Sequence, residues 1–204
     1  MNNGPEKCKA LPFFHRFTGG DTTSAFHNQG KRRGYDAWEV MPDMTKIFAS
    51  LGENGSVYIS DEVMRQIERF TIVMYSRTSP HTDLAVARQS MFADGRSLEC
   101  LPPTKEALKQ HSLRAILQTV IDKSAAHPFI DRPPPERCGW KKNAAGYWTP
   151  YWSEKPPVCK SLQQFIKCRC KKRCAGNCTC LSYPLPCTPL CACWSSGGCS
   201  RLTN

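Results

Sequence analysis

Apolar residues recur at the spacing of an α-helix through most of the first 127 positions of the chain. The clearest segment follows Ser60 and Asp61, where apolar side chains repeat every three or four residues and so share one helical face. The helical segments that we predict are residues 31–40, 43–51, 61–74, 83–91 and 104–120. Because no convincing alternation of apolar and polar residues marks a strand, we expect residues 10–127 to form a mainly α body.

Residues 128–157 differ from this body because they are rich in proline, aromatic residues and charge. The run 133–135 consists of three prolines, which break regular structure, so we expect a linker here. Aromatic residues are interleaved in it with Lys141 and Lys142, and they are Trp140, Tyr147, Trp148, Tyr151 and Trp152. We expect these side chains to pack the linker onto the body; the alternative is that they stack on unpaired nucleic-acid bases.

Residues 158–204 form a third region, which is both basic and rich in cysteine. This tail has seven Lys or Arg and no Asp or Glu, so it carries +7 of the chain's net charge of +11. The chain has 13 cysteines, and ten of them lie between Cys159 and Cys199. We find neither a signal-peptide core nor an apolar run near the roughly 18 residues of a membrane span. We therefore expect reduced thiols in a nuclear or cytoplasmic protein that is not secreted and not membrane-bound.

Nine tail cysteines follow the spacing C-x-C-x3-C-x3-C-x-C-x6-C-x3-C-x-C-x5-C. Structural zinc is tetrahedral and is commonly held by thiolates. Three zinc ions need 12 ligand positions, which nine thiolates supply if three of them each bridge two metals. We therefore predict a small irregular module at the C-terminus that holds three Zn²⁺ ions in one cluster. Its ligands would be Cys168, Cys170, Cys174, Cys178, Cys180, Cys187, Cys191, Cys193 and Cys199.

Basic side chains gather at the start of this cysteine ladder: Lys167, Arg169, Lys171, Lys172 and Arg173. Such an edge can contact phosphates and give salt-sensitive binding with little sequence information. The alternative is that the charges form only a solvated face. For the cysteines themselves, the alternatives are a disulfide scaffold and a metallothionein-like metal store.

The segment 168–199 resembles the CXC domain of tesmin-type chromatin proteins across nearly the whole cysteine ladder. This resemblance implies a three-zinc cluster on the nine cysteines and a module that binds DNA. Two features differ from that family. Its members usually carry two such modules where this chain has one, and their DNA-contacting tyrosine corresponds here to Asn177.

The stretch 11–34 packs an acid, hydroxyls, glycines and a basic run into a short span. Asp21 and the hydroxyl residues after it are typical of a helix N-cap. The alternative is that Asp21 is a metal-binding carboxylate and that the helix beginning at Lys31 meets a phosphate. With Arg32 and Arg33, Lys31 forms a second candidate nucleic-acid contact. One carboxylate does not make a catalytic metal site, since phosphodiester cleavage needs several acids.

The same stretch resembles mobile-element-derived proteins that have a flap-endonuclease-like PIN nuclease region with the pattern LPFxHAxTGCDTTSAFxGxGK. The resemblance continues at Trp38, at 68–70 (ERF), at 75–78 (YSRT), at 101–104 (LPPT) and at 139–140 (GW), and a CXC module closes those proteins. It implies that this chain corresponds to their C-terminal part, and that the other catalytic acids, with their Mg²⁺, belong to a preceding half. We therefore expect the 204 residues alone to be catalytically incomplete.

These observations favour a zinc-dependent nucleic-acid-binding protein, with DNA or chromatin as the partner. One alternative is the C-terminal portion of a metal-dependent PIN-type nuclease. A second alternative is a protein-interaction module in which zinc only stabilises the fold of the tail. No residue pattern indicates an oligomeric state.

Overall fold

Three helices of the body begin where a short polar side chain caps the first turn. In the computed structural model, the side chains of Ser60, Asp83 and Thr104 each accept a hydrogen bond from the backbone N–H three residues later. Such a bond satisfies one of the free N–H groups at a helix N-terminus. The predicted starts of these three helices are therefore confirmed.

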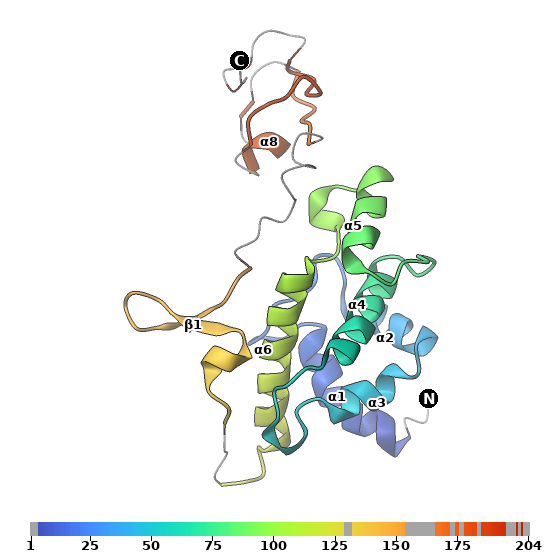
Figure 1. Cartoon of the computed structure of the whole chain (residues 1–204), viewed down its shortest axis with the longest axis vertical. Helices are drawn as coiled ribbons and strands as arrows, with labels where there is room; N and C mark the ends of the chain where they lie inside the picture. The colour runs from blue at the N-terminus through green and yellow to red at the C-terminus, as the bar shows by residue number, and fades with distance from the viewer. Residues whose placement is uncertain are drawn as a thin grey trace. The chain divides into compact units, whose positions relative to one another are not determined.

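The structure describes residues 4–128, 132–153, 166–171, 174–175, 178–182, 185–194, 199 and 201. The chain divides into two compact units, Met1–Lys155 and Pro156–Asn204. The helices of the first unit are α1 (Pro5–Phe17), α2 (Lys31–Val40), α3 (Met44–Ser50), α4 (Asp61–Tyr75), α5 (Leu84–Ala93) and α6 (Lys105–Lys123) (Figure 1). Three 3-10 turns accompany them, η1 (Glu53–Gly55), η2 (Leu98–Cys100) and η3 (Pro135–Cys138). The mainly α body predicted from the sequence is confirmed.

Aromatic side chains form the centre of this body. Helix α1 packs against α3 and α6, and α2 packs against α4. The rings of Phe14 and Trp38 lie 4.7 Å apart, and those of Phe48 and Phe70 lie 5.1 Å apart. Both separations suit the offset and edge-to-face contacts that aromatic rings prefer.

Helix α1 was not among the predicted segments, although its apolar residues follow a helical spacing. The buried residues Ala10, Phe13, Phe14 and Phe17 follow the spacing i, i+3, i+4, i+7, but Pro12 lies among them. A proline in a helix interior costs about 3 kcal/mol. Burying three phenylalanines contributes about 1.5–3 kcal/mol each, which outweighs that loss.

A β-hairpin occupies the segment that we predicted to be a linker. Strand β1 (Trp140–Lys142) pairs antiparallel with β2 (Trp148–Pro150), with Lys142 opposite Trp148. The expectation that the aromatic residues pack onto the body is wrong for Tyr147, which has 70% of its surface exposed. Trp152 is 61% exposed, but its ring lies near Arg114 of α6.

None of the helices in the described part of the chain combines the length and apolar character that a membrane crossing requires.

Candidate metal centre

The cysteine ladder begins on a segment whose residues alternate between buried and exposed. From residue 166 to 170 the buried or partly buried positions are Ile166, Cys168 and Cys170, while Lys167 and Arg169 are exposed. Exposed Lys171 continues the alternation. Every second side chain of an extended backbone points to the same side. The segment therefore directs its thiols inward and its cations outward.

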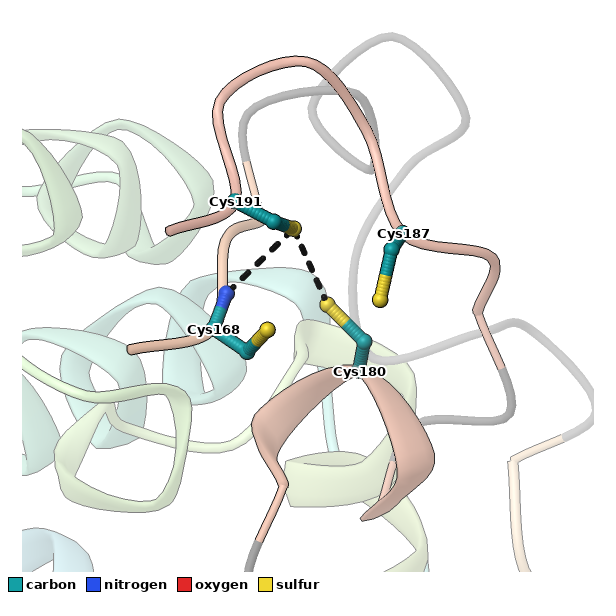
Figure 2. Close-up of side chains that lie close together, drawn as sticks. All are labelled: Cys168, Cys180, Cys187 and Cys191. Atoms are coloured by element: carbon teal, nitrogen blue, oxygen red, sulfur yellow. Dashed lines mark hydrogen bonds between the residues drawn. The ribbon is translucent and has the colours of Figure 1, made fainter. Parts of the chain in front are cut away.

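The nine cysteines of the ladder come together in the second unit, whose one described helix is α8 (Thr179–Ser182). Three sets of four sulfur atoms lie within 4.8 Å of one another. The sets are Cys168, Cys180, Cys187 and Cys191, then Cys168, Cys170, Cys174 and Cys178, and then Cys168, Cys174, Cys187 and Cys193. Figure 2 shows the first set, with its four side chains directed toward one another from separate segments.

The ninth cysteine, Cys199, joins the cluster through two members of these sets. Its Sγ lies 3.4 Å from Sγ of Cys174 and 3.6 Å from Sγ of Cys187. Each cysteine that we predicted as a metal ligand therefore lies in one of the three sets or, for Cys199, beside two of their members.

The separations between sulfur atoms distinguish the metal-binding interpretation from disulfides. Neighbouring Sγ atoms are 3.4–3.7 Å apart, as in the Cys199–Cys174 and Cys168–Cys174 pairs. A disulfide bond is about 2.05 Å long. Two thiolates on one tetrahedral zinc, each about 2.3 Å from the metal, are about 3.8 Å apart. The cysteines of the cluster are free thiols, and their spacing fits a four-thiolate metal site.

Backbone hydrogen bonds hold the cluster and reach one of its sulfurs directly. The N–H groups of Cys168 and Thr188 each donate to Sγ of Cys191, both at 3.4 Å. Ala192 N donates to Cys168 O at 3.0 Å, which ties the start of the ladder to the segment near its end. Donors of this kind orient a ligand and stabilise its negative charge. The spacing of cysteines alone gave no indication of these contacts.

Burial and crowding act against ionisation at most of these thiols. Burial, followed by neighbouring thiols, raises the pKa of Cys180 to about 12 and that of Cys170 to about 11, and it raises those of Cys174, Cys187 and Cys193. Burial acts in the same sense on Cys168, but hydrogen bonds from the Cys170 backbone and from adjacent thiols lower its pKa to about 6. A set of packed thiols thus tolerates few negative charges unless a cation compensates them.

The predicted cations of the tail lie partly within the described residues. Lys167, Arg169 and Lys171 are exposed. Lys172 and Arg173 lie outside the described part of the chain.

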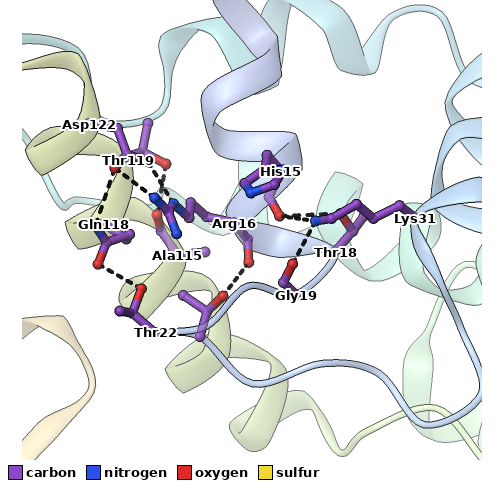
Figure 3. A network of polar contacts seen from close by, with 11 residues as sticks. His15, Arg16, Thr18, Gly19, Thr22, Lys31, Ala115, Gln118, Thr119 and Asp122 are labelled. Carbon is purple, nitrogen blue, oxygen red and sulfur yellow. Dashed lines mark hydrogen bonds and ion pairs between the residues drawn. The ribbon is translucent and has the colours of Figure 1, made fainter.

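The 18–30 loop contains Asp21, and the labelled loop residues Thr18, Gly19 and Thr22 form hydrogen bonds with α1, α2 and α6 (Figure 3). No helix begins directly at Asp21, which is exposed in a turn, so the N-cap interpretation of this residue is wrong. The hydroxyl of Thr23 donates to the carbonyl of Arg16 at 2.8 Å, and that of Thr22 donates to Gln118 Oε1 at 2.9 Å. The loop therefore joins α1 to α6.

Lys31 is also engaged. Its ammonium donates to the carbonyls of His15 at 2.8 Å and Gly19 at 2.6 Å, where it caps the end of α1 (Figure 3). Arg32 and Arg33 are exposed, and Arg33 donates to Gln29 Oε1 at 3.3 Å. Within the described residues, every group that could hold a metal consists of cysteines, and Asp21 belongs to none of them.

Comparison with known proteins adds no relative to this picture. No protein-family model, curated protein or solved structure matches the chain.

Proposed function

We propose that this protein binds nucleic acid, with DNA as the partner, through a C-terminal module folded around three zinc ions. The observation that carries the proposal is the grouping of the nine sulfurs into overlapping sets of four. Its likeness to tesmin-type CXC modules supports the same proposal. Zinc would supply the folding free energy, since the tail has few apolar side chains for a core.

The sulfur positions favour one arrangement of the ligands. Cys168, Cys180, Cys187 and Cys191 hold the first zinc, and Cys168, Cys170, Cys174 and Cys178 hold the second. Cys174, Cys187, Cys193 and Cys199 hold the third, since Cys199 approaches both Cys174 and Cys187. Every cysteine of the ladder is then used, each zinc has four ligands, and the three bridging thiolates are Cys168, Cys174 and Cys187.

The charges of the module favour a polyanion as its partner. Nine thiolates and three Zn²⁺ ions contribute −3, and the seven Lys and Arg of residues 158–204 leave a net charge of about +4. Lys167, Arg169 and Lys171 project from the segment whose alternate residues are zinc ligands. A row of outward cations is suited to contact successive phosphates.

The PIN-type nuclease remains the weaker candidate. Its support is the resemblance of the 11–34 stretch, in which Asp21 is the exposed acid. Most hydroxyls around it are engaged in holding α1 and α6 together, and the candidate metal groups of the described residues contain no carboxylate.

The metal content of the full chain tests the cluster. We expect native mass spectrometry of protein expressed with zinc to find three ions. Cys174→Ser removes a bridge shared by two metals, and Cys193→Ser removes a terminal ligand of one. The bridge variant should therefore lose more zinc than the terminal variant, while Cys8→Ser, outside the ladder, keeps all three. Equal zinc content in all four proteins would reject the arrangement.

Binding to a fluorescein-labelled DNA duplex, followed by anisotropy, tests the partner. If Lys167, Arg169 and Lys171 each contact a phosphate, they contribute a slope of about −2.7 to a plot of log affinity against log salt, or about 40-fold between 50 and 200 mM salt. A triple Glu variant should lose this contribution and keep its zinc, whereas Lys46→Glu on the exposed surface of the body serves as the control. Zinc-loaded protein without affinity for duplex DNA would favour the protein-interaction alternative.

A further inference from the structure

The β-hairpin of the body exposes large aromatic side chains with no acidic residue among them. Trp148 is 39% exposed, Trp152 is 61% exposed and Tyr147 is 70% exposed. From residue 137 to 153 the charged residues are Arg137, Lys141 and Lys142, and all three are exposed. Exposed large aromatic side chains set among cations are unusual for a protein face that meets nothing but water.

Cations and rings are paired across the hairpin. The ammonium of Lys142 lies 4.9 Å from the centre of the Trp148 ring, and that of Lys141 lies 5.3 Å from the centre of the Tyr151 ring. The pairing register places Lys142 opposite Trp148 on one face of the hairpin, and Lys141 points to the other face. Each face therefore presents a ring and a positive charge together.

The base of the hairpin is fixed to the body. The guanidinium of Arg114, on α6, donates to the carbonyls of Gly139 at 3.1 Å and Tyr151 at 3.2 Å. It also lies 5.3 Å from the centre of the Trp152 ring. These contacts hold both ends of the hairpin to one helix, so the exposed rings are presented from a firm base.

The tip is ordered by its own hydrogen bonds. Oδ1 of Asn143 accepts from the backbone N–H of Ala145 at 3.0 Å and of Tyr147 at 2.9 Å. Gly146 has a φ of +83°, which suits glycine at the turn. Little ordering of the hairpin would therefore be needed when a ligand binds.

We propose that this hairpin binds single-stranded nucleic acid, stacking unpaired bases on its exposed rings and placing phosphates beside Arg137, Lys141 and Lys142. Aromatic side chains stack on any base, whereas a positive groove follows the backbone of the strand. The bases of a duplex are already stacked on each other and offer no free face. A ring with an ammonium on one side can receive a base on its other side.

This site is separate from the zinc module and does not rest on the function proposed for it. The hairpin belongs to the first unit, and the cysteine cluster belongs to the second. The body would then recognise unpaired strands while the module binds duplex phosphates.

The test uses the full chain and a fluorescein-labelled (dT)12 oligonucleotide, with binding followed by anisotropy. We expect Tyr147→Ala and Trp148→Ala each to weaken binding about 5-fold to 100-fold, the loss of one stacked base. Tyr58→Ala is the matched control, because Tyr58 is 76% exposed on the same unit and lies outside the hairpin. Circular dichroism checks that each variant keeps the helices of the body.

Two results would overturn the proposal: no binding of (dT)12 by the unaltered chain, or equal weakening by Tyr58→Ala. The triple Glu variant of the zinc module separates this site from the other. If the hairpin binds the oligonucleotide, the triple Glu variant still binds (dT)12 although it has lost duplex binding. Tyr147→Ala or Trp148→Ala, added to the triple Glu variant, should then weaken this (dT)12 binding. Loss of this aromatic-dependent part in the triple variant would assign single-strand binding to the tail and reject the hairpin site.

Discussion

The guanidinium of Arg16 forms two hydrogen bonds with the carboxylate of Asp122, from Nε at 2.6 Å and from Nη2 at 2.9 Å. The pair joins the last turn of α1 to the last turn of α6, next to the loop that contains Asp21 (Figure 3). The side chains are 21% and 28% exposed, so water screens the contact only partly.

We expect Arg16→Met to lower the free energy of unfolding by about 1–2 kcal/mol, because a bidentate hydrogen bond between charged groups is lost. Urea unfolding followed by the fluorescence of buried Trp38 measures this loss. Asp122→Asn and the double variant complete a cycle that isolates the pair. The control is Arg65→Met, whose partner Glu62 lies on an exposed surface, and we expect it to cost under about 0.5 kcal/mol. Equal losses in the two positions would contradict the assigned role.

His111 should make the body less stable in mild acid. Its Nδ1 lies 2.7 Å from the hydroxyl of Ser24 and its Nε2 lies 2.7 Å from the carbonyl of Phe17. Burial lowers the pKa of His111 to about 4. The unfolded chain, with a histidine pKa near 6.5, then binds one more proton than the folded chain between about pH 4 and pH 6.5.

The contribution of neutral His111 to stability is thus fully present above about pH 6.5, and about 3 kcal/mol of it is lost as the pH falls to about 4. His111→Gln should remove this part of the pH dependence, although it lowers stability at neutral pH. His127→Gln, at an exposed position, should leave the dependence unchanged. Urea unfolding at several pH values supplies the comparison, and identical slopes for all three proteins would contradict the assignment.

Gly139 is the residue whose replacement should loosen the hairpin. Its φ is +78°, and a Cβ there would lie 2.6 Å from the carbonyl oxygen of Gln110. We expect Gly139→Ala to destabilise the hairpin base by about 2–3 kcal/mol, through the strained backbone and the clash together. Gly95→Ala shares the positive φ without a close neighbour, so about 1 kcal/mol is expected there.

Hydrogen exchange at the N–H of Tyr151 provides the measurement for Gly139→Ala, because this group donates to Gly139 O at 2.9 Å. Exchange should accelerate about 30-fold or more in Gly139→Ala and remain unchanged in Gly95→Ala, which lies away from the hairpin. Unaltered exchange in both variants would show that the helix does not restrain the hairpin base.

Features set by neighbouring residues were the ones that the sequence predicted well. Caps such as Ser60 and Thr104 act within one helical turn, so their chemistry is visible in the chain itself. The cysteine ladder is similar, because C-x-C pairs commit two thiols to the same region. The mainly α body and the clustering of the cysteines followed from such local rules.

What the sequence did not predict depends on partners far along the chain. Asp21 resembled a cap, yet the loop after it is held by Gln118 and by the backbone of Arg16. The hairpin was missed because its anchor, Arg114, lies on a distant helix. The grouping of sulfurs into sets of four likewise requires the path of the folded tail, which spacing alone does not give.

Because buried and exposed residues alternate from Ile166 to Lys171, the side to which each side chain points depends on the number of residues between them. Insertion of a single residue between Cys168 and Cys170 would place these two thiols on opposite sides of the segment. Insertion of two residues would restore the phase and change only the reach of the segment. The segment should therefore tolerate a change of two residues in its length better than a change of one. A change of one residue would disturb the metal ligands and the outward cations together.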